Sequence, residues 1–123
     1  MSLLKIALGV GVLAFVACYS TQGSWLAENK GRADARKDLK AGKLKVEVMG
    51  GPPAPWEGTY GRLLKERYGI EYNWVADCVV SDQVIGHAKG YNEIMGAEIT
   101  RRFGKDALGK TAEEARKTPA TTP

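Results

Sequence analysis

The feature that most limits how this chain can fold is an uninterrupted apolar run near its N-terminus, residues 6–18. Thirteen residues without a polar face require a lipid phase, an export machinery or burial on every side. Lys5 precedes the run, as in the charged start and short apolar core of a secretory signal. As a helix the run rises only about 20 Å, against about 30 Å for the core of a bilayer. The sequence therefore predicts an exported or membrane-tethered protein.

The end of this run leaves several fates open. Ala17 and Cys18 resemble the lipobox of bacterial lipoproteins, in which the Cys after a small residue becomes lipidated, and the resemblance makes Cys18 the lipidation candidate. Counted from Leu3, with Lys5 snorkelling, the run reaches about 17 residues, the lower edge of what can span a membrane. A lipoprotein signal, a retained anchor and an ordinary cleaved signal are the alternatives. A buried helix of a cytosolic protein is the fourth.

Composition divides the rest of the chain into three parts after the signal or anchor of residues 1–19. Residues 20–42 are highly charged and have only a thin apolar stripe at helical spacing, which predicts a spacer helix that packs weakly. Residues 43–104 alternate strand and helix patterns. Residues 105–123 have short helical potential and end in Thr, Pro and Ala, which predicts a polar, partly disordered tail. The net charge of +4 is modest and spread along the chain, so no nucleic-acid partner is expected.

Hydrophobic periods predict two strands and two helices within the central part. Residues 44–48 alternate apolar side chains with polar ones such as Glu47, and residues 70–78 alternate in the same way, as strands with one buried face do. Residues 57–69 and 82–103 repeat apolar positions at helical spacing, and each segment ends at a glycine or just before one. With the spacer helix, this order predicts a small two-layer α/β (α+β) domain, α-β-α-β-α. Two strands form a marginal sheet, which favours a partner strand or a dimer.

Small residues lie on the side of the last long helix opposite its apolar face, at Gly86, Gly90 and Ala97. They allow a second backbone to approach closely, from the charged N-terminal helix or from another subunit. The other interpretation is that they are merely tolerated on a solvated surface, where each glycine costs about 1 kcal/mol relative to alanine.

Catalytic chemistry has little support in the sequence. Cys78 and His87 are the Cys and His that follow the apolar segment, and a thiolate with an imidazole could form a nucleophilic pair. However, nothing in their spacing brings them together, and burial of Cys78 on the apolar face of its strand would raise its pKa and make it unreactive. No catalytic residue, metal site or cofactor is predicted, because the motifs that would mark them are absent.

Aromatic side chains give the binding candidates. Trp56 and Tyr60 follow a proline-rich loop and suit the binding of a peptide or carbohydrate, although Trp56 could equally fill the core. His87 and Tyr91 on the last long helix complete the set. A pocket between the second strand and this helix is the alternative, formed by Tyr72, Cys78, His87 and Tyr91.

Residues 65–104 resemble a family of small bacterial envelope or lipoprotein-like proteins, for which no activity is known. The resemblance depends on Arg67-Tyr68-Gly69, Cys78-Val79-Val80 and Gly90-Tyr91-Asn92. The resulting hypothesis is a noncatalytic module in the cell envelope, membrane-anchored or periplasmic, that contacts the membrane through its N-terminal segment and binds an unknown protein partner or a second copy. A small-molecule binder or enzyme, and a single-span accessory subunit of a membrane complex, are the alternatives.

Overall fold

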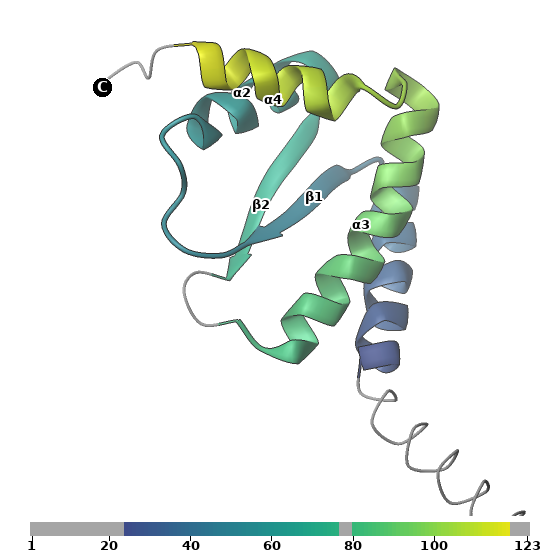
Figure 1. Ribbon diagram of the computed structural model, residues 1–123. Coiled ribbons are helices and arrows are strands. Elements are labelled where there is room, and N and C mark those ends of the chain that lie inside the picture. The colour runs from purple at the N-terminus through teal and green to yellow at the C-terminus, as the bar shows by residue number, and fades with distance from the viewer. Residues whose placement is uncertain (1–23, 77–79, 119–123) are drawn as a thin grey trace, which may run out of the picture.

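The structure, a computed structural model, describes residues 24–76 and 80–118 (Figure 1). Residues 24–40 form a helix, which is followed by β1 (Leu44–Met49), α2 (Glu57–Tyr68), β2 (Ile70–Ala76), α3 (Asp82–Phe103) and α4 (Ala107–Lys117). The mixed helix and strand content confirms the predicted α+β class and the order of its first five elements. Cys18 and the whole N-terminal apolar run lie outside the described residues, as does Cys78.

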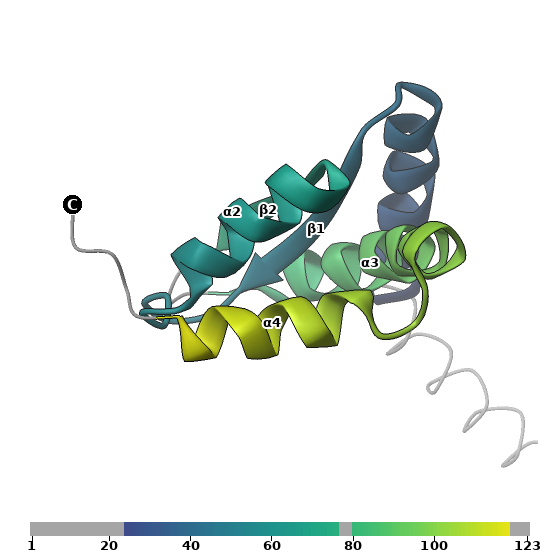
Figure 2. The same cartoon turned by 90° about the horizontal axis from the view of Figure 1, so that it is seen from above.

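The two strands pair in parallel, with Leu44 opposite Ile70 and an irregularity between Val48 and Met49. One face of the sheet packs on α2, where Tyr72 lies against Gly61. Helix α2 packs against α4, and Figure 2 shows α2 on the side of the strands opposite to helix 24–40 and α3. The side chains at the centre of the core are buried: Ala35, Leu44, Leu64, Ile70, Tyr91, Met95 and Ile99.

The expected helix ends are present. Gly69 closes α2 with a left-handed backbone (φ 68°), which a residue without a Cβ adopts freely, and β2 begins at the next residue. Ser81 caps α3, because its side chain accepts a hydrogen bond from the backbone N–H of Val84 at 3.3 Å. Both ends therefore follow from the local sequence.

The expectation that the charged N-terminal helix packs weakly is wrong. Gly31 of helix 24–40 lies so close to α3 that a Cβ there would be 2.8 Å from the backbone N of Tyr91. A Cβ on Gly90 would be 2.7 Å from the carbonyl carbon of Glu28. The two helices thus meet backbone to backbone at glycines, which a stripe of apolar side chains does not reveal. Gly86 and Gly90 of α3 serve the close approach rather than a solvated surface.

The C-terminal part is also more ordered than predicted. Helix α4 buries Ala107, Thr111 and Ala115 at four-residue spacing, and α2 packs against it. Arg67 of α2 donates two hydrogen bonds of 2.6 Å to the carboxylate of Glu114. Small side chains such as Ala and Thr give a weak hydrophobic signal, so the buried face of α4 was not predicted from the sequence. Residues 119–123 of the expected disordered tail lie outside the described part.

No helix within residues 24–76 and 80–118 is long and apolar enough to cross a membrane.

Candidate functional site: a histidine between two carboxylates

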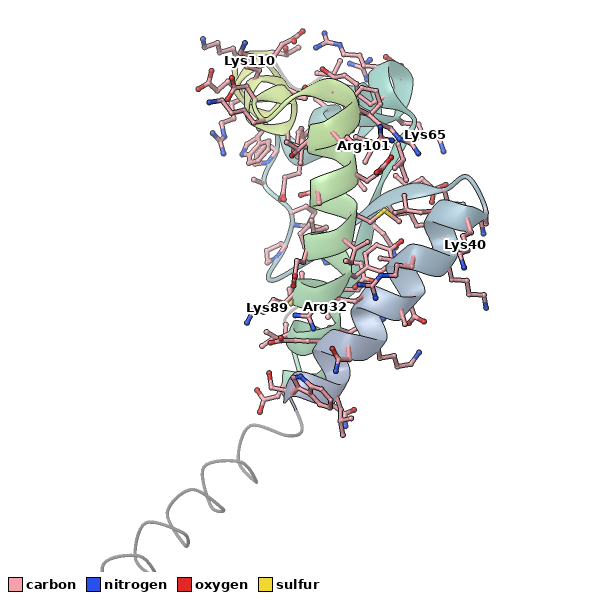
Figure 3. The ribbon with its side chains drawn as sticks, turned by 90° about the vertical axis from the view of Figure 1, so that its right-hand side faces the viewer. Arg32, Lys40, Lys65, Lys89, Arg101 and Lys110 are labelled. Carbon is pink, nitrogen blue, oxygen red and sulfur yellow. The ribbon has the colours of Figure 1, made fainter. Side chains whose placement is uncertain are left out.

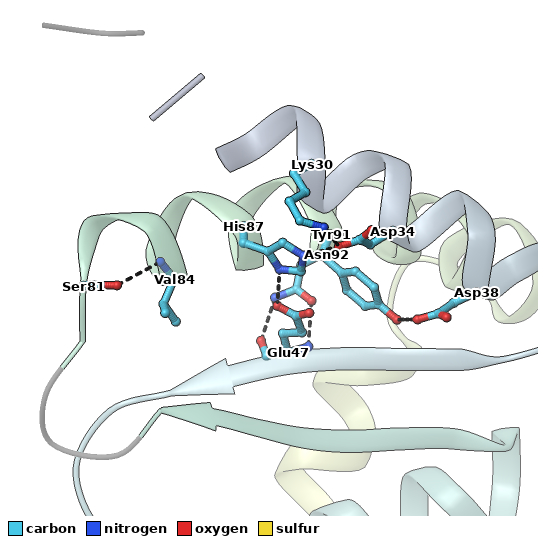
Figure 4. Close-up of polar contacts among 9 residues, drawn as sticks. All are labelled: Lys30, Asp34, Asp38, Glu47, Ser81, Val84, His87, Tyr91 and Asn92. Carbon is cyan, nitrogen blue, oxygen red and sulfur yellow. Dashed lines mark hydrogen bonds and ion pairs between the residues drawn. The ribbon is translucent and has the colours of Figure 1, made fainter. Parts of the chain in front are cut away.

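His87 occupies the junction of three elements (Figure 4). It projects from the second turn of α3, and its Nδ1 lies 3.0 Å from Oε2 of Glu47 on β1. Its Nε2 lies 2.8 Å from Oδ2 of Asp34 on helix 24–40. Ionised carboxylates only accept hydrogen bonds, so both ring nitrogens are best matched when both carry a proton, as in the imidazolium form.

The charges at this junction favour that form. Burial opposes a charge on His87, but the hydrogen bonds and negative charges of Asp34 and Glu47 together outweigh it and raise the pKa of His87 above its ordinary value of 6.5. The hydrogen bond from His87, followed by that from Lys30, lowers the pKa of Asp34. The group is therefore a chain of opposite charges, Lys30 to Asp34 to His87 to Glu47, that joins helix 24–40 to β1 through α3.

Asn92 explains why a charged residue is buried in β1. Its side-chain Oδ1 accepts a 2.8 Å hydrogen bond from the backbone N–H of Glu47, and its Nδ2 donates a 2.7 Å bond to the backbone O of Glu47. The amide of Asn92 thus takes the place of a neighbouring strand on the free edge of β1. With α3 held there, the Glu47 side chain is only 9 % exposed, although the alternation of the strand had placed it on the polar face.

Tyr91, one helical turn after His87 on α3, adds further contacts to the junction. Its ring stacks beside His87 at a centroid distance of 5.9 Å, and its hydroxyl donates a 2.6 Å hydrogen bond to Oδ2 of Asp38. Burial, then the bond to Asp38, raises the pKa of the Tyr91 hydroxyl well above its usual range. The Tyr91 hydroxyl therefore stays neutral and donates a further hydrogen bond from α3 to helix 24–40.

Two hollows border the junction. The larger, about 580 Å³, lies where the strands end and α3 begins, and its lining is Leu26, Ala27, Lys30, Glu47, Val75, Gln83, Val84 and His87. The smaller, about 370 Å³, is lined mostly by charged and polar groups of helix 24–40 and the strands. His87 and Glu47 border both hollows. Apolar walls with a few convergent polar groups, at the carboxyl ends of parallel strands, are typical of a ligand site.

The other aromatic candidates lie elsewhere. Trp56, Tyr60 and Tyr72 form a series of contacting rings with centroid distances of 5.8 and 5.4 Å, and the guanidinium of Arg116 lies 4.5 Å from the centre of the Trp56 ring. The Tyr72 hydroxyl donates a 2.7 Å hydrogen bond to Glu57 of α2, which raises its pKa together with burial, the larger cause. The structure therefore brings His87 and Tyr91 together but places Tyr72 on the opposite face of the sheet.

Sequence reasoning missed the partners of His87. Asp34 and Glu47 look like ordinary surface charges in the sequence. The one available signal was the four-residue spacing of Asp34 and Asp38, which places these two carboxylates on the same face of their helix. Both ring nitrogens of His87 are taken by carboxylates, and within the described ranges no group of three or more His, Cys, Asp or Glu residues could hold a metal ion.

Comparisons with family models, with curated proteins and with solved structures give no match to this chain. The resemblance to small envelope proteins thus stays a prediction, and functional inference depends on the geometry of the site.

Proposed function

We propose that this chain is a noncatalytic binding module, held at a membrane of the cell envelope by its N-terminal segment, and that the hollow of about 580 Å³ beside His87 receives its ligand. The observation that carries the proposal is the hollow itself. Its size falls in the range of sites for small ligands and short peptide segments, about 300 to 1,000 Å³. The tether is supported by the apolar run of residues 6–18.

The ionisable groups around the hollow support binding rather than catalysis. A general base needs a nitrogen or oxygen that is free to take a proton from a substrate. Both nitrogens of His87 already face carboxylates, and the raised pKa of Tyr91 keeps its hydroxyl protonated and bound to Asp38. These groups fix the shape of the site, because each of them is hydrogen-bonded to a carboxylate of the chain.

The lining indicates what the ligand resembles. Leu26, Val75 and Val84 supply apolar walls, whereas Lys30 and Gln83 supply donors beside them. Lys30 is exposed, so its ammonium can accept a new partner with little desolvation cost. The matching ligand is an apolar group next to one hydrogen-bond acceptor, as on a short peptide segment of a partner protein.

Photochemical crosslinking of the full chain in its own membrane tests this proposal. A benzoylphenylalanine placed at Gln83, an exposed position on the rim of the hollow, should give a discrete peptide-containing adduct. The same group at Lys110, exposed on α4, should not.

A filling substitution makes the test specific. Val84→Trp adds volume to the wall of the hollow and should abolish the adduct formed at Gln83, whereas Thr100→Trp, at an exposed position further along α3, should leave it unchanged. Equal adducts from Gln83 and Lys110, or an adduct that survives Val84→Trp, would contradict binding in the hollow.

A further inference from the structure

Large apolar side chains are exposed at one end of the described domain. Four such residues are exposed in residues 24–76 and 80–118, and three of them belong to this end: Trp25 (57 %), Leu26 (61 %) and Ile85 (48 %). The first turns of helix 24–40 and α3 lie side by side there, since a Cβ on Gly86 would be 2.9 Å from the Cβ of Ala27 and 3.2 Å from the backbone O of Ser24. Figure 1 shows these two helix starts together at the lower end of the domain.

This end is also the one nearest to the apolar run in the sequence. Five residues, 19–23, separate the last residue of the run from Ser24. Even a fully extended chain of that length keeps the two within about 22 Å. A run held in a membrane would therefore keep the exposed apolar end within reach of the lipid headgroups.

Charges around this end are compensated rather than uniformly positive. Lys30 and Lys89 lie one turn beyond Leu26 and Ile85 (Lys89 is labelled in Figure 3), with side chains 71 % and 69 % exposed. Each pairs with an acidic group at 3.0 Å, Lys30 with Asp34 and Lys89 with Glu28. Contact with a membrane here would depend on apolar and aromatic side chains, and Trp is the residue that most favours the interface.

We propose that the end formed by residues 24–27 and 83–86 lies in the headgroup layer of a zwitterionic membrane, with Trp25, Leu26 and Ile85 inserted. The inference rests on the proposed tether. A second copy fits less well, because a stable dimer buries about 800 Å² on each partner and three half-exposed side chains supply a few hundred at most. Since Leu26 and Val84 also line the larger hollow, this orientation places the hollow beside the membrane surface.

Fluorescence quenching by brominated phosphatidylcholine measures the contact in the full chain, reconstituted in vesicles of that lipid. The double variant Trp56→Phe/Trp74→Phe leaves Trp25 as the one fluorescent indole, and Trp25→Phe/Trp74→Phe leaves Trp56 as its matched control. We expect several-fold stronger quenching of Trp25 than of Trp56, unchanged by salt. Leu26→Glu with Ile85→Glu, both at exposed positions, should reduce the quenching of Trp25 without unfolding the chain.

Flotation of the same vesicles on a density gradient separates the two levels of the proposal. If the chain floats with the vesicles but Trp25 is quenched no more than Trp56, the tether stands and the insertion of this end into the headgroup layer is overturned. A chain that does not float would overturn the tether and the orientation together. Quenching of Trp25 that is lost as the chain dimerises would show that a second copy, not lipid, covers this end.

Discussion

Gly90→Ala is the substitution that most sharply tests the contact between helix 24–40 and α3. The new methyl carbon would lie 2.7 Å from the carbonyl carbon of Glu28 and 2.9 Å from its Cα. Carbon atoms pack at about 3.5 Å or more, so the two backbones would have to separate by at least about 0.8 Å. The carbonyl oxygen of Glu28, which lies nearest to the new methyl group, requires a still larger shift. Such a shift would also stretch the 3.0 Å bond between Lys89 and Glu28 and the 2.8 Å bond between His87 and Asp34.

Two opposing effects decide whether Gly90→Ala raises or lowers the free energy of unfolding. Alanine is favoured over glycine within a helix by about 1 kcal/mol. Overpacking against rigid backbone costs about 3 kcal/mol, the upper part of its usual range, because no flexible side chain can move aside. Gly90→Ala should therefore lower the free energy of unfolding by about 2 kcal/mol.

Gly96→Ala is the matched control, since it makes the same change in the same helix at a glycine with nothing within 4 Å. It should raise the free energy of unfolding by up to about 1 kcal/mol, which separates the two variants by about 3 kcal/mol. Urea unfolding of the full chain in mild detergent, followed by near-ultraviolet circular dichroism, measures both values. Equal midpoints for the two variants would refute the close approach of the helices.

Three further outcomes follow from the described contacts. Because folding raises the pKa of His87, the stabilisation from its charge should be complete below the ordinary value of 6.5 and lost as pH rises through the folded value. Urea unfolding against pH should therefore show a fall in stability above pH 6.5 that His87→Gln removes. Asn92→Asp replaces the donor to the Glu47 carbonyl with a carboxylate oxygen and should cost about 1 to 3 kcal/mol by urea unfolding, whereas Asn73→Asp, at an exposed position, should cost little. Ala115→Glu forces a charge between α4 and α2 and should lower the thermal midpoint, while an α4 that stays packed in nuclear Overhauser contacts would contradict the burial of Ala115.

Much of the fold is readable from short-range patterns. Alternation at residues 44–48, the glycine that ends α2 and the serine that begins α3 are local signals, and local chemistry decided each of them. The α+β class and the order of the first five elements followed from these signals. The close approach at Gly90 was one of two interpretations of the small residues on α3, but its counterpart Gly31 was not identified, because hydrophobic periodicity scores apolar side chains and glycine has none.

The candidate site was harder to predict from the sequence, since it depends on which helices and strands pack against one another. His87 and Tyr91 were identified as aromatic and titratable residues on one helix, and the structure brings them together. Glu47 could not be recognised, because a glutamate in an alternating strand looks solvated until Asn92 is known to bind the same residue's backbone from α3. The hollow likewise exists only once helix 24–40 is packed in place, and the sequence indicated a spacer there.

The protonation of His87 is the most direct measure of whether helix 24–40 and β1 close around this residue and frame the hollow. His87 is the one histidine in the chain, so a long-range ¹H–¹⁵N correlation spectrum of the full chain in detergent contains a single imidazole. At pH 6.5, where an ordinary histidine is half protonated, both ring nitrogens should show predominantly the shifts of protonated sites, and the titration midpoint should lie above that value. A titration midpoint at or below that ordinary value would contradict the closed junction between Asp34 and Glu47.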